Sequence, residues 1–405
     1  MEFLRPFVRS STGSFYTLSR SRLTTQHALW KKQLPHVKPY YAVKCNPDPL
    51  LLKWLYQENV SFDCASAREL KMVAEQFGEK PTGDRLLLAN PCKTINDIEF
   101  AQSLKVPWVT ADSVEELVKM DKVGWRPNII LRIAVDDTGS SCPFGAKFGL
   151  APEQVKEVAL ATKTFRMPLA GLSFHVGSGN HESDAFGDAI RLSRSIWGGL
   201  PDSVRPFDLP VLDIGGGWSH IPSLFMKQSA SARKALAEFC PESPTTIIAE
   251  PGRFFAAPTH TLYVRVMGKK PRKGGGWRYT IDESIYGQFG CIPFDHAKPA
   301  IGRLRESAND SARPTTPASI FGRTCDSLDW IANSPNMEEL EVGDWLIIPE
   351  MGAYTTATAT EFNGFPKPPV FLTDEIPTED HISWLNHLQY PFVKSLSTEE
   401  AVQMS

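Results

Sequence analysis

Short apolar segments alternate with longer amphipathic segments between residues 38 and 250. The apolar segments are rich in β-branched and aromatic residues and are followed by polar turns, which is typical of strands. The longer segments have apolar residues three and four positions apart, as helices do, for example in ARELKMVAEQFG, SVEELVKMDKVG and PEQVKEVALATKT. The eight predicted strands are KPYYAV, SFDC, LLLA, WVTAD, IILRIA, LAGLSFHV, VLDIGG and TTIIAE.

This alternation predicts an α/β fold. Strands that are apolar along their whole length indicate parallel strands buried on both faces by helices. Eight such units over about 200 to 250 residues are what a (β/α)8 barrel of the TIM type requires. A doubly wound open sheet is the alternative, because periodicity alone does not exclude it. We expect the barrel to occupy residues 24–260.

The pattern changes from Thr261 onward. Four short strand-like segments, YVRVMG, WRYTID, SIFGRT and DWLIIPE, are separated by turns rich in glycine, proline or charge. Short strands with frequent turn signals and few helices indicate a mostly antiparallel β domain. The segment SFYTL at 14–18 precedes the barrel and is expected to join this sheet. The predicted β domain therefore comprises residues 1–23 and 261–405.

Composition narrows the class of partner. The chain has 405 residues, a net charge of −3 and a sequence pI near 6.3, so charge does not favour a nucleic acid or an anionic membrane. No apolar run has the length of a membrane span. A small molecule is the expected ligand.

Cysteine usage indicates a reducing compartment. The seven cysteines are scattered without the spacing of a disulfide framework or a zinc site, so we expect no metal and a cytoplasmic location. The first 22 residues are basic and rich in serine and threonine, as transit peptides are, but SFYTL within them reads as a strand.

Polar residues follow several of the predicted barrel strands. Function in such barrels collects at the carboxyl ends of the strands, so these residues are expected to lie at one rim. Any one of them alone is more often structural: a histidine on a strand is usually a core residue, and a glycine triplet is usually a turn. The residues at these ends are Lys44, Asp63, Asn90, His175, Gly215, Gly216, Gly217, Glu250 and Arg253.

The glycine triplet predicts a phosphate site. Loops after the seventh and eighth strands commonly bind phosphate in these barrels, and glycine lets backbone N–H groups approach the phosphate oxygens. Ser178 in HVGSG and Arg253 in AEPGR can add a hydroxyl donor and a charged fork.

A lysine, a carboxylate and an imidazole at the same rim suggest which phosphorylated ligand binds. Pyridoxal 5′-phosphate needs an amine for its aldehyde, an anion to keep its ring nitrogen protonated, and a flat group against its ring. Lys44, Glu250 and His175 are the candidates for these three tasks. The alternative for Lys44 is a rim lysine whose charged end reaches solvent.

The motifs of the chain resemble those of the eukaryotic-type ornithine decarboxylases, which belong to the fold-type III pyridoxal-phosphate decarboxylases. The resemblance runs in register from about Ser14 to Phe365 and implies an alanine-racemase-like barrel with a β domain, in agreement with the strand pattern. The motifs are YAVKCN, FDCAS, ANPCK, HVGSG, DIGGG, AEPGR, YGQFGC, FDH, TCDSLD and GDWLIIPEMGAYTTATATEFNGF.

The resemblance implies roles for the barrel residues. Lys44 would be the Schiff-base lysine, supported by Asp63 and Glu69, and Glu250 would pair with the ring nitrogen. His175 would stack on the cofactor ring. The phosphate would be held by Ser178, Gly215, Gly216, Gly217, Arg253 and Tyr354.

The resemblance also implies a homodimer whose active sites are shared. Cys325 and Asp326 would reach into the partner's barrel, and Phe362 would line the same interface. After loss of the α-carboxylate, the Cys325 thiol would return a proton to the α-carbon. The alternative for Cys325 is a small buried hydrophobic residue. Substrate contacts would come from Tyr286, Asp295 and Asp326.

Ornithine is the substrate that the FDH segment favours, with putrescine as product, because Asp295 and His296 are both kept. Decarboxylation of lysine or arginine, and a catalytically silent regulatory homologue, are the alternatives. Three departures from the family pattern bear on substrate choice and rate. Pro143 stands where animal enzymes have arginine, Phe294 where tyrosine is common, and Arg323 replaces the proline of Gly-Pro-Thr. An added cation in that loop is expected near the pocket for a cationic amine.

Overall fold

The computed structural model describes residues 11–77, 83–205, 209–239, 245–305 and 310–373. The chain divides into two compact units, residues 24–255 and residues 1–23 with 256–405. The first unit contains a closed parallel barrel and the second an eight-stranded sheet.

The barrel contains all eight strands predicted from the apolar segments. Each pairs in parallel with its neighbour, and the first strand pairs with the last, so the sheet closes and the open-sheet alternative is wrong. Its interior is filled by side chains such as Tyr40, Ile130 and Ile248. The strands are β2 (Val37–Ala42), β3 (Ser61–Cys64), β4 (Leu86–Leu88), β5 (Trp108–Ala111), β6 (Asn128–Arg132), β7 (Leu169–Ser173), β8 (Val211–Asp213) and β9 (Thr246–Ala249).

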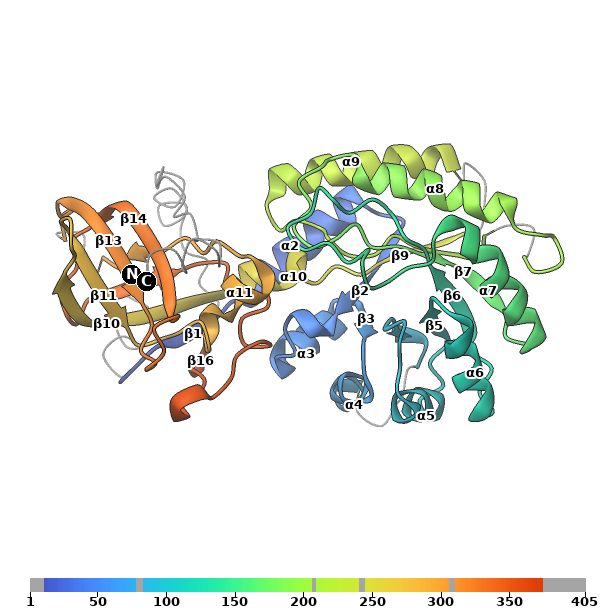
Figure 1. The fold of residues 1–405 in the computed structure, drawn as a ribbon, viewed down its shortest axis with the longest axis horizontal. Helices are drawn as coiled ribbons and strands as arrows, with labels where there is room; N and C mark the ends of the chain where they lie inside the picture. The colour runs from blue at the N-terminus through green and yellow to red at the C-terminus, as the bar shows by residue number, and fades with distance from the viewer. Residues whose placement is uncertain (1–10, 78–82, 206–208, 240–244, 306–309, 374–405) are drawn as a thin grey trace. The chain divides into compact units, whose positions relative to one another are not determined.

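Helices surround this barrel, as Figure 1 shows. Their starts follow local capping rules: Asp48 accepts from the backbone N–H groups of Leu50 and Leu51, and Thr94 forms a capping box with Asp97. The helices are α2 (Arg20–Gln33), α3 (Pro49–Gln57), α4 (Ala67–Ala74), α5 (Ile95–Ser103), α6 (Val114–Lys122), α7 (Pro152–Thr164), α8 (Ala185–Gly199), α9 (Pro222–Phe239) and α10 (Arg253–Ala256), with 3-10 turns η2 (Val43–Cys45), η3 (Glu75–Phe77) and η4 (Gly83–Arg85). None of the helices in the described ranges is both long and apolar enough to cross a membrane.

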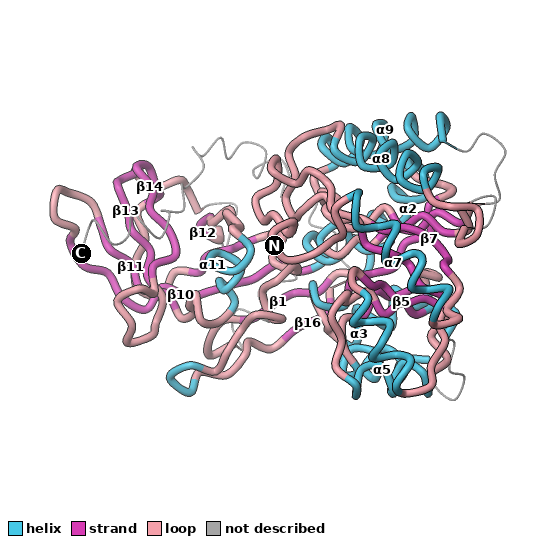
Figure 2. The backbone as a smooth tube through the Cα atoms, turned by 45° about the vertical axis from the view of Figure 1, so that its right-hand side comes forward, coloured by secondary structure: helices cyan, strands magenta, loops and turns pink. Residues whose placement is uncertain are grey.

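The second unit is a β domain in which strands and loops predominate, as the colours of Figure 2 make clear. Its strands run in the order β12-β15-β10-β11-β13-β14, and β1 adds to β10. The strands are β1 (Phe15–Leu18), β10 (His260–Pro271), β11 (Trp277–Ile281), β12 (Gly302–Arg303), β13 (Thr315–Phe321), β14 (Trp330–Glu338), β15 (Trp345–Ile348) and β16 (Val370–Leu372), with short helices η5 (Ala257–Thr259), η6 (Gln288–Gly290), α11 (Cys291–Asp295) and η7 (Phe362–Gly364).

The pairing of these strands agrees with the predicted mostly antiparallel domain. Among the strands of this domain that the structure describes, only β11 with β13 and β1 with β16 pair in parallel. The segment SFYTL forms β1 and pairs antiparallel with β10, as expected. A core that includes Tyr16, Leu262, Tyr279 and Phe289 fills the domain.

Strand β14 was not predicted, because its sequence WIANSPNME contains Asn and Pro residues that usually indicate a turn. The structure accommodates Pro335 in two ways. β14 is the last strand in the order, so the missing N–H is tolerated at an edge. Pro335 also falls within a register shift, between the pairs Ala318–Ser334 and Thr316–Met337.

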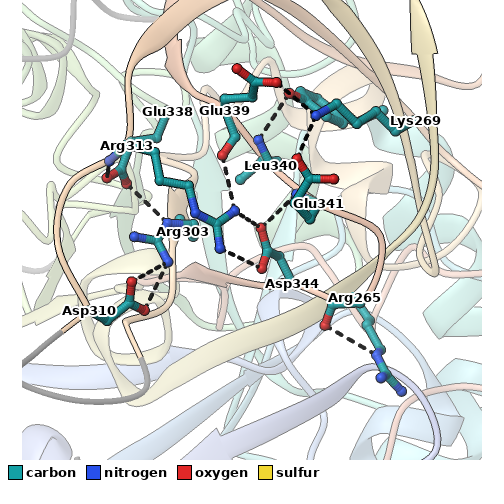
Figure 3. A network of polar contacts seen from close by, with 12 residues as sticks. Arg265, Lys269, Arg303, Asp310, Arg313, Glu338, Glu339, Leu340, Glu341 and Asp344 are labelled. Atoms are coloured by element: carbon teal, nitrogen blue, oxygen red, sulfur yellow. Dashed lines mark hydrogen bonds and ion pairs between the residues drawn. The ribbon is translucent and has the colours of Figure 1, made fainter.

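A network of ion pairs connects loops of the β domain (Figure 3). Arg303, at the end of β12, donates from Nη1 to both carboxylate oxygens of Asp310 at 2.9 and 2.8 Å. Its Nε lies 3.4 Å from Glu338 at the end of β14. The Arg303 side chain is only 2% exposed, so water contributes little to stabilising its charge. The network continues through the pairs Arg313–Asp344, Lys269–Glu339 and Lys269–Glu341.

Removing the buried arginine should destabilise the β domain. Arg303→Met removes the buried cation beside Glu338, which keeps its contacts with the more exposed Arg305 and with the Arg313 N–H, and we expect the free energy of unfolding to fall by about 2 to 4 kcal/mol. Urea unfolding measures this change. Arg191→Met is the control, since Arg191 pairs with Asp188 and Glu238 on the exposed face of α8 and should unfold at the wild-type urea concentration. Equal midpoints for the two variants would contradict the assignment of Arg303 as a buried partner.

Candidate active site

Lys44 emerges from the barrel just after β2 ends. The strand turns into the 3-10 segment Val43–Cys45, in which Val43 and Cys45 are buried and the Lys44 side chain is 44% exposed. Its Nζ lies 3.0 Å from Oδ2 of Asp63, which is almost fully buried on the neighbouring strand β3. The amine is therefore held at the rim by a carboxylate while its end stays accessible.

Glu69 supports the loop after β3. Its Oε2 accepts from the Ala65 N–H at 2.6 Å, which fixes the chain beside Asp63. Burial raises the pKa of Glu69, and the nearby Asp63 carboxylate raises it further. The other oxygen of Asp63, Oδ1, is buried and has no hydrogen-bond partner among the described residues.

His175 follows β7 and presents a neutral imidazole. Its Nδ1 accepts from the Gly177 N–H at 3.0 Å, so the neutral ring carries its proton on Nε2. Burial lowers the pKa of His175 well below its usual value, and the charges of Arg132 and Lys44 lower it further. The Phe144 ring meets it edge-on at 4.9 Å. The ring is therefore suited to flat contact rather than to carrying a charge.

The glycine triplet forms a turn in which residues larger than glycine do not fit. Gly215 and Gly217 have φ of +63° and +100°, which favour glycine. A Cβ on Gly216 would lie 2.6 Å from His175 Nε2 and 2.9 Å from the Glu250 carbonyl oxygen. The turn is anchored because Gly215 O accepts from Trp218 Nε1 at 3.0 Å and from the Glu250 N–H at 2.8 Å.

Arg253 and Ser178 are brought together from separate loops. Arg253, at the start of α10, donates from Nη2 to Oγ of Ser178 at 2.9 Å. The Ser178 backbone is fixed by a two-bond bridge to Cys142, each bond 3.1 Å long. The Arg253 guanidinium and the Ser178 hydroxyl thus lie next to each other, as the predicted anion site requires.

Two charged groups at the barrel rim were not singled out from the sequence. Asp213 ends β8, and its Oδ1 accepts from the Gly215 N–H at 2.9 Å while its buried Oδ2 has no hydrogen-bond partner in the described chain. Arg132 ends β6, with its guanidinium 4.8 Å from the Phe148 ring centroid. Each is the last residue of its observed strand but lies inside the longer segment predicted to be strand, so the rule that identified Lys44 finds them only once the strand end is known.

Asp213 and Glu250 form an acidic pair. Burial raises the pKa of Asp213 to about 7. Burial also raises the pKa of Glu250 well above its usual range, and the carboxylates of Asp213 and Asp63 raise it further, while Lys44 and Arg132 oppose this. The pair therefore favours a positive group placed against it.

Asn90 connects two loops at the ends of barrel strands. Its Nδ2 donates to the Ala65 carbonyl at 3.3 Å, and its Oδ1 accepts from the Cys92 N–H at 3.2 Å. Pro143 lies in a loop held by Asp137, whose carboxylate accepts from the N–H groups of Phe144 and Gly145.

A second group of predicted residues lies within the β domain. Tyr286 donates its hydroxyl hydrogen bond to Asp326, and its ring centroid is 4.5 Å from that of Phe362. The Cys325 N–H donates to Asn363 Oδ1 at 3.0 Å, and the Cys325 side chain is exposed. The Leu328 N–H and the Tyr286 hydroxyl lower the pKa of Asp326. The structure therefore gathers Tyr286, Cys325, Asp326 and Phe362.

The remaining predicted residues occupy turns of the same domain. Asp295 is buried at the end of α11, and His296 caps that helix in the left-handed conformation with φ of +52°. Phe294 is 67% exposed. Tyr354 is also left-handed, and its carbonyl accepts from Thr358 Oγ1 at 2.7 Å.

Comparison with known proteins decides the family. Residues 20–257 match the family described as "Pyridoxal-dependent decarboxylase, pyridoxal binding domain". The chain belongs to the pyridoxal-dependent decarboxylases. It is 37% identical to the chloroplastic ornithine decarboxylase of Nicotiana glauca over 87% of this chain and 81% of that protein. It is 38% identical to the ornithine decarboxylase of Saccharomyces cerevisiae over 87% and 79%.

Solved structures of decarboxylases have the same fold. The arginine decarboxylase of Paramecium bursaria Chlorella virus, bound to agmatine, has a TM-score of 0.84 at 35% identity and covers 92% of this chain and 98% of its own. The Vibrio vulnificus lysine/ornithine decarboxylase complexed with putrescine has a TM-score of 0.79 at 30% identity, over 93% and 98%. The predicted family, barrel and cofactor are confirmed.

The barrel residues fit pyridoxal phosphate. The orphaned carboxylate oxygens of Asp63 and Asp213 are buried acceptors, and the space that a Cβ on Gly216 would fill lies beside His175. Arg253 and Ser178 supply the donors that a phosphate requires. The positive ring nitrogen and the anionic phosphate of the cofactor thus each have groups of suitable charge.

Filling the glycine turn should impair cofactor binding. In Gly216→Ala the new methyl group must displace His175 or the Glu250 backbone, and we expect the cofactor Kd to rise by about tenfold or more, equivalent to about 1.4 kcal/mol. Titration of the apoprotein followed by absorbance measures this. Gly198→Ala in α8 is the control, since no atom lies within 4 Å of the added Cβ. Wild-type affinity in Gly216→Ala would contradict the assigned position of the cofactor.

Proposed function

We propose that this protein decarboxylates L-ornithine to putrescine and CO2. The observation that carries the proposal is the grouping of Lys44, Asp63, His175 and Glu250 at the rim of a barrel that belongs to the pyridoxal-dependent decarboxylases. Ornithine is favoured because the relatives from tobacco and yeast are ornithine decarboxylases and because Asp295 and His296 are both present. The product would supply polyamine or polyamine-derived alkaloid synthesis.

Arginine or lysine is the second candidate substrate. The solved structures that resemble this chain include an arginine decarboxylase and a lysine/ornithine decarboxylase. All these substrates share the α-amino acid group and a positive distal group, and they differ in side-chain length and in whether the distal cation is an ammonium or a guanidinium. The choice between them therefore depends on side chains that meet the distal cation.

The barrel residues would divide the work of holding the cofactor. Lys44 would hold its aldehyde carbon covalently, with Asp63 orienting the amine. Ser178, Arg253, the glycine turn and Tyr354 would hold the phosphate. When bound, pyridoxal phosphate supplies a ring that accepts the electron pair left at the α-carbon by loss of CO2.

Glu250 and Asp213 would keep that ring positively charged. Burial disfavours negative charge on both carboxyls, and the two carboxylates repel each other. A positive charge on the ring nitrogen offsets both effects, so the pair favours the protonated ring. His175 would cover one face of the ring as a neutral imidazole and exclude water. Because its pKa is lowered, it adds no charge that would oppose the ring proton.

Residues of the β domain would complete the reaction. Cys325 would donate the proton of its Sγ–H to the α-carbon and regain one from solvent. Asp326 and Asp295 would attract the distal amine, with Tyr286 orienting Asp326 through their hydrogen bond. Phe362 would supply an apolar wall beside Tyr286.

A homodimer with shared active sites is part of this proposal. Cys325 and Phe362 are exposed on the chain, and so is Leu328 in the same turn, as expected for residues that meet a partner. A cytoplasmic location is also proposed, since the six cysteines that the structure describes are thiols outside any disulfide. A chloroplast location is the alternative, because the tobacco relative is chloroplastic.

A comparison of substrates should decide the activity. Purified protein with added pyridoxal phosphate is offered ornithine, lysine or arginine, and the amine is identified by mass. We expect putrescine from ornithine at the highest kcat/KM and no amine from Lys44→Ala, with Lys53→Ala on helix α3 as the control. Cadaverine or agmatine as the main product would show that lysine or arginine is the preferred substrate. Failure with all three substrates would favour a silent homologue.

Replacing the proposed proton donor should separate decarboxylation from amine release. In Cys325→Ala we expect cofactor affinity to be unchanged and putrescine formation to fall by about 100-fold or more, within the range that general acids contribute. Cys92→Ala is the matched control, since Cys92 is also exposed but lies in the barrel unit. Wild-type putrescine output from Cys325→Ala would remove the role assigned to the thiol.

A further inference from the structure

Hydrogen bonds to Asp329 hold one end of the turn that carries Cys325 and Asp326. This turn, residues 322–329, connects β13 to β14. Asp329 is buried; its Oδ2 accepts from the N–H and hydroxyl of Thr324 at 3.0 and 2.6 Å, and its Oδ1 accepts from the Ile285 N–H at 2.9 Å. The carboxyl end of the turn is therefore fastened to the segment that also carries Tyr286.

Arg323 fastens the other side of the same turn. Its N–H donates to the Glu283 carbonyl at 3.2 Å, and its Nη2 lies 3.6 Å from Glu283 Oε1. Its guanidinium carbon is 4.1 Å from the centroid of the Phe365 ring, a cation–π arrangement. One residue thus connects the turn to two other segments, one before α11 and one after η7.

Glu283 is a buried carboxylate that depends on this cation. Its side chain is 2% exposed, and its Oε2 accepts from the Gln288 N–H at 2.6 Å. Burial raises the pKa of Glu283 to about 7, and the Gln288 N–H and Arg323 counteract that rise, while the neighbouring Asp282 adds to it. Arg323 is the added cation that the sequence predicts near the pocket for the distal amine, and Glu283 beside it offsets part of its charge.

We propose that Arg323 is a positioning residue for the reaction, because its contacts with Glu283 and Phe365 fix the turn that presents Cys325 and Asp326. The turn at residues 322–329 contains no proline, which would restrict φ covalently. Here an ion pair and a ring contact restrict the same turn. The inference rests on the proposed function, since it assigns the turn a place in the proton-transfer step.

The kinetic test uses the full-length holoenzyme and three substitutions. Arg323→Met removes the charge and keeps most of the length, Arg323→Lys keeps the charge, and Glu283→Gln keeps the shape of the carboxyl. We expect Arg323→Met to lower kcat by about tenfold and to raise KM, since the turn carries both Cys325 and Asp326 and small misplacements of a reacting group are costly. The ratio of amine to CO2 should fall below that of the wild type, and Arg323→Lys should restore part of both.

Glu283→Gln should show a similar loss of kcat, and adding Arg323→Met should cost less than the two single losses combined, because both act on one contact. The control is Arg305→Met, which removes an arginine–glutamate pair with Glu338 elsewhere in the domain and should keep the wild-type kcat and amine ratio. A merely structural role for Arg323 would lower the amount of folded enzyme and leave the kcat per folded enzyme, the KM and the amine ratio at their wild-type values.

Hydrogen exchange distinguishes failure of this inference from failure of the proposed function. Amides of residues 322–329 should exchange faster in Arg323→Met than in wild type or Arg305→Met, whichever amino acid is the substrate. If no amino acid is decarboxylated, the proposed function fails and exchange alone decides whether Arg323 fixes the turn. Wild-type exchange in Arg323→Met, or a wild-type kcat and amine ratio, would overturn the proposal.

Discussion

The carboxyls of Asp63, Asp213 and Glu250 lie together at the carboxyl ends of barrel strands, and burial disfavours the charged forms of Asp213 and Glu250. This constraint orders the rest of the site. Lys44 and Arg132 are cations that offset these acids, and His175 is kept neutral by burial and further by the same two cations. A ligand with a positive ring nitrogen is therefore favoured by the charge of the site itself, before any specific contact is considered.

The barrel could be predicted from the sequence because its strands are apolar along their length and parallel. Once eight such strands are counted, their carboxyl ends must share one rim, so Lys44, His175 and Glu250 could be assigned to one site although they are widely separated in the chain. Arg132 and Asp213 were missed for a related reason. Each lies inside a segment that the pattern predicts to be strand. Whether its side chain lies at the rim depends on which residue makes the last backbone pair of the strand.

The β domain was harder to predict because its stability depends on distant contacts. Pro335 in β14 is tolerated only because that strand lies at an edge and shifts register there. The partnership of Arg323 with Glu283 joins residues 40 positions apart (323 − 283) and leaves no local pattern in either segment. Sequence comparison with the family identified Arg323 as a departure, but only the fold shows that a carboxylate balances its charge.

The pairing of β1 with the β domain has a consequence for synthesis of the chain. The Tyr16 hydroxyl donates a hydrogen bond to Gln288, 272 positions later, and β1 pairs with β10 although all the barrel strands lie between them in the sequence. During translation, β1 is synthesised before the barrel and β10, so it cannot pair with β10 until both have been translated. Its edge stays unpaired during that interval, so it is exposed to pairing with other nascent chains. The barrel, whose eight strands come from one continuous stretch, can close before that pairing is made.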